Sequence, residues 1–199
     1  MIIIHHRRNT INELQKTDFR FGIEVDIRSN NGELIIEHDP FKIGAKFKDW
    51  LKFYNHKFLI LNVKEEGLEQ NLFDIMKINS IENYFLLDQT FPSLIKTSFN
   101  GNRNSAVRLS EFESIETVVN LSSKINWVWI DMFSRFPIDK KKYLLLKNIG
   151  YKLCIVSPEL HNNPDIEIFN LYKLLKKEKI SCDAVCTKKP FLWEKLINN

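Results

Sequence analysis

The stretch FGIEVDIRSNNGELIIEHDP, from Phe21 to Pro40, carries the clearest pattern in the chain. In its first half polar and apolar residues alternate, so a strand here places Glu24 and Asp26 on one face and Val25 on the other. Two carboxylates that face a protein interior are costly unless a cation or protons neutralise them. Oxygen ligands suit Mg²⁺ or Ca²⁺, so the pair predicts a site for a divalent cation.

A turn signal follows in the same stretch. Asn30-Asn31-Gly32 lies between two short runs, Glu24–Arg28 and Glu33–Glu37, and predicts a β-hairpin. The returning strand ends in Glu37-His38-Asp39-Pro40, so a histidine and another acid come at the end of the hairpin. We therefore expect polar, reactive side chains on both strands of this hairpin.

Short apolar runs recur along the rest of the chain, each bounded by polar residues. They are aromatic or β-branched and apolar on both faces, as expected for strands of a parallel sheet covered on both sides. Segments with helical spacing lie between them. The predicted strands are Ile2–His5, Phe21–Ile27, Phe58–Val63, Tyr84–Leu87, Ala106–Leu109, Trp127–Ile130, Lys152–Val156 and Asp183–Cys186. The clearest predicted helices are Phe47–Phe53, Leu68–Met76, Ile115–Leu121, Lys140–Ile149 and Ile166–Leu175.

Strand and helix thus alternate about eight times, which is the pattern of an α/β fold of the TIM-type (β/α)₈ barrel class. Thr10-Ile-Asn-Glu13 has the form of a capping box and predicts a short first helix. No linker or Pro/Gly-rich break divides the sequence, so residues 1–199 are predicted to form a single domain. The alternative is an open doubly wound sheet, but the sequence lacks the glycine-rich phosphate loop that would favour it.

Composition narrows the choice of partners and compartment. The net charge of +4 is a mild basic excess, which suits anionic ligands and does not indicate nucleic-acid binding. Cys154, Cys182 and Cys186 lie in apolar runs, and an odd count without close pairing predicts reduced thiols and a cytoplasmic setting. No apolar run approaches the ~20 residues that a transmembrane segment needs.

Two further strand ends carry polar side chains, and reactive groups of barrels gather where strands end. The first predicted strand ends in His5-His6-Arg7-Arg8. The third ends in Leu61-Asn62-Val63-Lys64-Glu65-Glu66, where alternation puts Asn62 and Lys64 on one face. We expect these groups to meet the paired carboxylates and the hairpin histidine at one mouth of the barrel.

This combination of side chains suits the cleavage of a phosphodiester. His6 and His38 can share the general base and general acid roles near neutral pH. Arg7 offers a planar fork for phosphate oxygens. Lys64 and a divalent cation can stabilise the negative charge that develops on the phosphate.

The order and spacing of His6-Arg7, Glu24-x-Asp26 and His38-Asp39 resemble those of glycerophosphodiester phosphodiesterases. Phosphatidylinositol-specific phospholipases C and spider-venom-type sphingomyelinases D are similar at greater distance. Asn9-Thr10 is similar to the family's Asn-Thr after the first strand, and Thr187-Lys188-Lys189-Pro190 is similar to its final Thr-Asp-x-Pro.

The resemblance implies a phospholipase-C-like barrel that hydrolyses a small-molecule or headgroup phosphodiester. It implies that His6 and His38 are the acid/base pair, that Glu24 and Asp26 bind Mg²⁺ or Ca²⁺, that Arg7 contacts the phosphate and that Lys64 lies near it.

The sequence departs from the family pattern at several points. Arg8 stands where the family has glycine, and the family's substrate-capping insertion is reduced to residues 41–57. Asn62 replaces the third carboxylate that the family carries two residues before the lysine. An asparagine can bind a cation through its carbonyl oxygen, so Asn62 is the predicted third ligand, with Glu65 or Glu66 as alternatives.

Three other interpretations stay open. The replacements at Arg8 and Asn62 fit a catalytically degenerate barrel that binds a phosphorylated ligand without turnover. Another barrel enzyme, such as a sugar-phosphate isomerase, fits the fold but not the hairpin. Arg108, Glu111 and Asp131 lie near the ends of later strands and either line the pocket or form salt bridges within the barrel.

Overall fold

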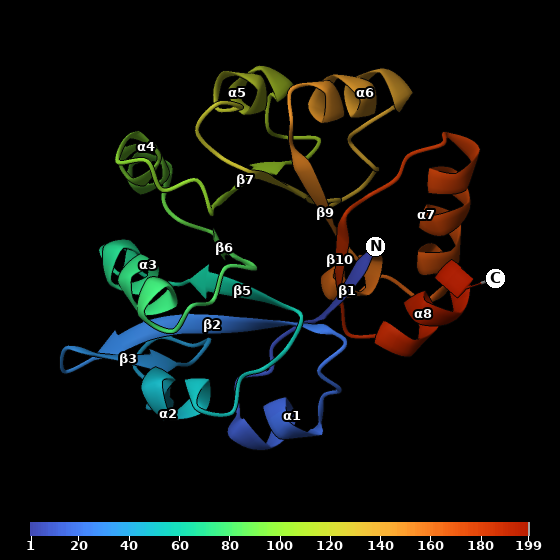
Figure 1. Ribbon diagram of the computed structural model, residues 1–199. Coiled ribbons are helices and arrows are strands. Elements are labelled where there is room, and N and C mark those ends of the chain that lie inside the picture. Colours follow the sequence, from blue (N-terminus) through green and yellow to red (C-terminus); the bar gives the residue numbers. More distant parts are fainter. Residues whose placement is uncertain (199) are drawn as a thin grey trace. The chain divides into compact units, whose positions relative to one another are not determined.

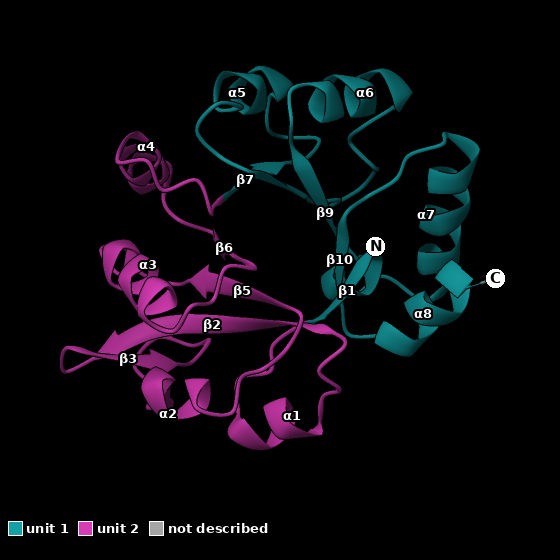
Figure 2. Ribbon diagram, viewed as in Figure 1, with its two compact units in different colours: residues 1–5, 106–199 teal, residues 6–105 magenta. Residues whose placement is uncertain are grey.

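The computed structural model describes residues 1–198, which form an α/β fold in which helices follow mostly parallel strands (Figure 1). The chain forms two compact units, shown in separate colours in Figure 2. Unit 1 contains Met1–His5 and the chain from Ala106 onward, and unit 2 contains His6–Ser105. None of the helices within residues 1–198 is long and apolar enough to cross a membrane.

Unit 2 contains a mixed sheet in the order β4-β3-β2-β5-β6. Strand β2 runs parallel to β5, and β5 runs parallel to β6, whereas β3 is antiparallel to both β2 and β4. The strands are β2 (Gly22–Asn30), β3 (Glu33–Ile36), β4 (Ala45–Lys46), β5 (Phe58–Val63) and β6 (Tyr84–Leu87). The helices are α1 (Ile11–Lys16), α2 (Phe47–Leu51), α3 (Glu69–Ile78) and α4 (Phe91–Phe99).

The predicted hairpin is confirmed between β2 and β3, where Asn30 pairs with Glu33. Asn31 and Gly32 at its tip have φ angles of 50° and 79°. Both angles are positive, as a tight two-residue turn between twisted strands requires, and Asn-Gly is the dipeptide that adopts them at least cost. The predicted capping box is confirmed as well, with Thr10 as the N-cap of α1.

The two faces of β2 have different surroundings, and this difference places the site. Ile23, Val25 and Ile27 belong to a buried apolar cluster with side chains of α1, α2 and α3. The alternate residues of β2 therefore point to the opposite face of the sheet. The parallel register with β5 pairs Asp26 with Asn62, so their side chains lie next to each other on that face.

Unit 1 contains a parallel sheet in the order β1-β10-β9-β8-β7. The strands are β1 (Ile2–His5), β7 (Ala106–Leu109), β8 (Trp127–Ile130), β9 (Lys152–Val156) and β10 (Ala184–Thr187). The helices are α5 (Ile115–Asn120), α6 (Lys140–Asn148), the 3₁₀ turn η1 (Pro158–His161), α7 (Ile166–Lys177) and α8 (Pro190–Asn198). Cys154, Cys182 and Cys186 are buried thiols in or next to these strands.

The alternation predicted from the sequence is confirmed, and most predicted strands have the bounds expected. The pattern missed α4 and α8, both of which begin near a proline, Pro92 and Pro190. Proline suits the first turn of a helix, where its missing N–H has no helical partner. The closure of a (β/α)₈ barrel and the single domain over residues 1–199 stay predictions.

Candidate active site

Glu24 and Asp26 form the centre of the candidate site. Both side chains are fully buried on the face of β2 that points away from the helices. Every other predicted site residue lies in unit 2, either on β5 or in the segments that follow β1, β3 and β5. The paired acids predicted from the sequence are therefore present as a buried pair, with the expected neighbours near the ends of strands.

Glu24 receives polar groups at both carboxylate oxygens. The backbone N–H of Arg7 donates to Oε2 at 2.7 Å, and Nδ2 of Asn62 donates to Oε1 at 3.0 Å. Nε2 of His6 lies 3.9 Å from Oε2. Burial, and next the charge of Asp26, raise the pKa of Glu24 to about 7. The pair thus favours a bound proton or cation near neutral pH.

Asp26 is held by three residues from two segments, the loop after β1 and the end of β5. Asn9 forms two hydrogen bonds with Asp26. Its Nδ2 donates to Oδ2 of Asp26 at 2.8 Å, and the backbone N–H of Asp26 donates to Oδ1 of Asn9 at 3.1 Å. Nε of Arg7 lies 3.5 Å from Oδ2, and Nζ of Lys64 lies 3.2 Å from Oδ1. Both cations expected to face a phosphate therefore converge on one carboxylate.

The loop after β1 turns sharply to make these contacts. Arg7 has a φ of 51°, in the left-handed region that a non-glycine residue adopts at a cost of roughly 1–3 kcal/mol. The backbone N–H of Arg8 donates to the Glu24 carbonyl at 2.9 Å, and Nε1 of the buried Trp50 donates to the Arg8 carbonyl at 3.0 Å. Helix α2, in the shortened 41–57 segment, therefore supports the loop that carries His6 and Arg7.

His38 lies beyond the end of its strand. The sequence pattern extended the strand through Glu37, whereas β3 ends at Ile36 and His38 stands in the turn that follows. Nδ1 of His38 lies 2.8 Å from Oδ1 of Asp39. Hydrogen bonds from Lys42 and then from His38 lower the pKa of Asp39 to about 2. The ionised carboxylate favours the tautomer with a proton on Nδ1, which leaves Nε2 of His38 for proton exchange.

The donors present suit a hard divalent cation. Residues 1–198 hold no group of three or more His, Cys, Asp or Glu side chains placed to bind one metal ion. However, Oδ1 of Asn62 is buried and accepts no hydrogen bond from the described residues. This amide oxygen, together with the carboxylates of Glu24 and Asp26, gives three oxygen donors on one face of the sheet. Glu65 instead contacts Ser29 and Arg28.

Three residues that the sequence reasoning left without a role belong to this network. Asn9 holds Asp26, Arg28 contacts the backbone near His38, and Oδ2 of Asp88 lies 3.9 Å from Nζ of Lys64. Arg28 follows Asp26 by two residues, so strand alternation could have placed it on the same face. Asp88 directly follows β6, where the strand-end argument could have found it.

The secondary candidates form a separate network in unit 1. Nη1 of Arg108 lies 2.8 Å from Oδ2 of Asp131, and Nε2 of His161 lies 2.5 Å from Oδ1. Glu111 accepts hydrogen bonds from the backbone of the loop after β8, including the N–H of Ser134 at 2.5 Å. The structure thus agrees with the salt-bridge interpretation of Arg108 and Asp131.

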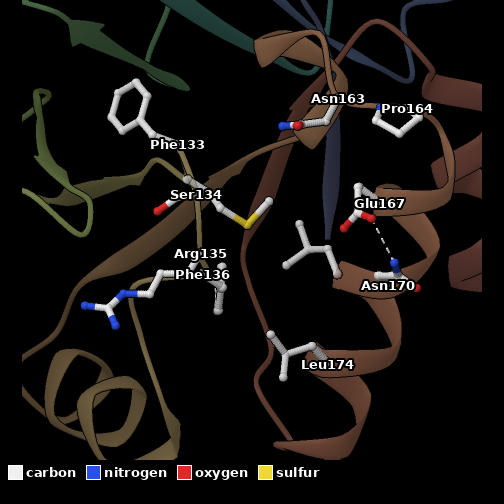
Figure 3. A pocket seen from close by; sticks show the side chains of 11 residues that line it. Phe133, Ser134, Arg135, Phe136, Asn163, Pro164, Glu167, Asn170 and Leu174 are labelled. Atoms are coloured by element: carbon white, nitrogen blue, oxygen red, sulfur yellow. Dashed lines mark hydrogen bonds between the residues drawn. The ribbon is translucent and has the colours of Figure 1, made fainter.

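A pocket of about 400 Å³ also lies within unit 1. Figure 3 shows it between the segment that contains Phe133 and Arg135 and the first turns of α7, where Nδ2 of Asn170 donates to Glu167. Its lining residues include none of the predicted site residues.

Comparison with solved structures gives the fold a name. A glycerophosphoryl diester phosphodiesterase from Parabacteroides distasonis is 11% identical, with a TM-score of 0.67 over 99% of this chain and 86% of that one. A glycerophosphodiester phosphodiesterase from Agrobacterium tumefaciens is 11% identical, with a TM-score of 0.67 over 100% of both chains. A candidate enzyme of the same kind from Galdieria sulphuraria is 14% identical, with a TM-score of 0.72 over 100% of this chain and 98% of that one.

This chain has the glycerophosphodiester phosphodiesterase fold. The resemblance first seen in His6-Arg7, Glu24-x-Asp26 and His38-Asp39 is therefore matched by a likeness over the whole length. No protein-family model and no curated protein sequence matches the chain. The identities of 11–14% make it a divergent example of the glycerophosphodiester phosphodiesterase fold.

Proposed function

We propose that the protein is a metal-dependent phosphoric diester hydrolase that cleaves a glycerophosphodiester or a related phosphodiester. One observation carries the proposal: four of the predicted residues converge on the buried carboxylates. His6, Arg7 and Asn62 approach Glu24, while Arg7 and Lys64 approach Asp26. The fold shared with glycerophosphodiester phosphodiesterases supports the same reaction class, and with it the closed (β/α)₈ barrel.

Glu24, Asp26 and Asn62 are the residues that would hold a divalent cation, Mg²⁺ or Ca²⁺. Such a cation supplies Lewis-acid stabilisation of a phosphoryl oxygen. Two observations support this assignment: burial raises the pKa of Glu24, and Oδ1 of Asn62 is buried without a hydrogen bond from the described residues. The Glu24 carboxylate and the Asn62 amide oxygen are both polar groups that are costly to bury without a partner.

The chain's own side chains divide the remaining work. His6 takes the proton from the attacking water or hydroxyl as its oxygen bonds to phosphorus. Arg7 and Lys64 stabilise the phosphoryl oxygens as negative charge grows on them. His38 gives a proton from Nε2 to the leaving alkoxide as the second phosphorus–oxygen bond breaks, and Asp39 stabilises the ring through Nδ1.

A screen of phosphodiesters with Mg²⁺, Ca²⁺ and Mn²⁺, read by phosphorus NMR, tests the proposal. We expect a monoester product from a small-molecule or headgroup diester, and loss of that product in His6→Ala and in excess chelator. Absence of turnover by the folded wild-type protein across the screen would reject the proposal that the protein is a phosphodiester hydrolase.

A second function, phosphate binding without turnover, has one observation in its favour. Asn9 donates to Oδ2 of Asp26, and the cationic groups of Arg7 and Lys64 lie 3.5 and 3.2 Å from its carboxylate oxygens, so the chain itself supplies positive charge to this acid. Calorimetry with glycerol phosphate in chelator distinguishes the two functions. Binding there, with no turnover of any diester when metal is supplied, would support the binding protein.

The three buried thiols also support a cytoplasmic setting as part of this proposal, because disulfides are rare there. The proposed substrate is a small-molecule or headgroup phosphodiester and not a nucleic acid, in keeping with the protein's mild net charge of +4.

A further inference from the structure

Arg28 is the third residue in the alternating series that begins with Glu24 and Asp26. It therefore points to the same face of β2 as the two carboxylates. Only 17% of its side chain is exposed. A charged group that is mostly buried must find hydrogen-bond acceptors within the protein. The acceptors that Arg28 uses are the backbone carbonyls of two residues assigned to the reaction.

The guanidinium group joins two segments of the candidate site. Nε and Nη2 of Arg28 both donate to the carbonyl oxygen of His38, at 3.1 and 3.0 Å. Nη1 donates to the carbonyl oxygen of Lys64 at 3.3 Å. A carboxylate oxygen of Glu65, the next residue, lies 3.9 Å from the same nitrogen. The forked group thus holds the main chain after β3 to the main chain after β5.

His38 needs such support because it lies in the turn beyond its strand, whereas Lys64 directly follows β5 and donates its backbone N–H to the Ile27 carbonyl at 3.0 Å. Strand β3 ends at Ile36, and β5 ends at Val63. The turn after β3 is exposed at its tip, where the side chain of Lys42 has a relative exposure of 62%. Acid catalysis needs His38 within hydrogen-bond reach of the leaving-group oxygen. A mobile turn would move the histidine out of that reach.

We propose that Arg28 is a positioning residue that fixes His38 relative to Lys64 through their backbone carbonyls. The proposal rests on the hydrolase function proposed above for its catalytic consequence, whereas its structural consequence does not depend on that function. Arginine suits the role because its planar fork donates along several fixed directions at once. A lysine has one ammonium group, which cannot reproduce the paired bonds to His38 together with the bond to Lys64.

The test compares full-length Arg28→Met and Arg28→Lys with wild type. Arg103→Met is the matched control, since Arg103 is an exposed arginine of the same unit. Turnover is measured with Mg²⁺ on a glycerol–choline phosphodiester and on bis-nitrophenyl phosphate. Trypsin cleavage after Lys42 is followed under native conditions, and melting temperatures show that each variant is folded.

We expect Arg28→Met to lose about 10²-fold in kcat on the glycerol–choline diester, a loss typical of a catalytic group displaced by about 1 Å. The loss should be several-fold smaller on the nitrophenyl diester, whose leaving group needs no proton. Cleavage after Lys42 should be faster than in wild type and Arg103→Met. Arg28→Lys should lie between the two and provides the test if Arg28→Met does not fold.

Equal losses on the two substrates, or wild-type turnover in both Arg28 variants, would overturn the positioning role. Unchanged cleavage after Lys42 in a folded Arg28 variant would also overturn it. If wild type cleaves neither diester, the hydrolase proposal fails by itself. Faster cleavage after Lys42 would then still support the structural role of Arg28.

Discussion

Asn62 donates its side-chain amide to Oε1 of Glu24 at 3.0 Å and keeps its own Oδ1 buried without a hydrogen-bond donor among the described residues. Asn62 thus places an uncharged amide oxygen at the position where the glycerophosphodiester phosphodiesterase pattern that the sequence resembles has a carboxylate. Asn62→Glu should raise the affinity for Mg²⁺ or Ca²⁺ about tenfold or more, because a third negative charge strengthens the attraction for the cation. Calorimetric titration of the two proteins measures the difference.

The same replacement should lower the melting temperature in chelator, because a third buried acid adds repulsion to the pair at Glu24 and Asp26. Asn62→Gln is the matched control, since it lengthens the side chain without adding charge. Cation affinity that is equal in wild type, Asn62→Glu and Glu24→Ala would contradict the metal site at this position.

Stability should fall as the pH rises from about 4.5 towards 7 when no cation is present. Burial and then Asp26 raise the pKa of Glu24 from 4.5 to about 7. Between these values the folded protein holds a proton that the unfolded chain has released. The free energy of unfolding therefore decreases across this window, by on the order of 3 kcal/mol, and the stabilisation is lost above about pH 7.

Denaturant unfolding in chelator at pH 5 and pH 8 measures this effect, with Glu24→Gln as the control that lacks the titrating group. The difference between wild type and Glu24→Gln should change with pH in the stated direction. Added Mg²⁺ or Ca²⁺ should stabilise wild type more at pH 8 than at pH 5, because protons and the cation compete for the same carboxylates. A difference that is independent of pH would contradict the raised pKa.

The two histidines should respond differently to the leaving group. His38→Ala should lose about 10²–10⁴-fold on a glycerol or choline diester, the usual scale of general acid–base catalysis, and much less on a nitrophenyl diester. His6→Ala should lose activity on both. Rate–pH profiles should lose one limb in each single variant. Equal losses of His38→Ala on both substrates would reject its role as the acid.

Trp50 tests whether α2 supports the active-site loop. Trp50→Phe removes the hydrogen bond to the Arg8 carbonyl, and we expect a loss of about 1–3 kcal/mol in the free energy of unfolding. Turnover should also fall, since the loop carries His6 and Arg7. Phe47→Leu is the control, because it removes buried volume from the same helix and leaves in place the Trp50 indole N–H that donates to the Arg8 carbonyl. Normal turnover in folded Trp50→Phe would contradict the link between helix and loop.

Local sequence signals were enough to predict much of the site's framework. Alternation placed Glu24 and Asp26 on one face, and Asn31-Gly32 specified the hairpin, because both depend on residues that are close in the chain. The contacts of Asn9 and Arg28 could not be predicted in this way. Asn9 meets Asp26 only when the loop after β1 has packed against β2, and Arg28 meets Lys64 only after β2 and β5 have paired.

His38 shows the same limit at smaller scale. The hydrophobic pattern indicates a strand up to Glu37, but it carries no information on where the ladder stops. The strand ends at Ile36, and Arg28 and Asp39 then determine the position of the histidine. Side-chain hydrogen bonds decide the last part of the geometry, and those bonds involve residue types that occur on any protein surface.

The pairing of β1 with β10 affects the order in which the two units can fold during synthesis on the ribosome. Ile2 aligns with Ala184 and His5 with Thr187, so β1 cannot pair with this neighbour until β10 has been translated. The strands of the unit 2 sheet all lie within His6–Ser105, a continuous stretch of the chain. Nascent chains should therefore acquire protease resistance in His6–Ser105 first, while Met1–His5 can pair only after β10 has been made.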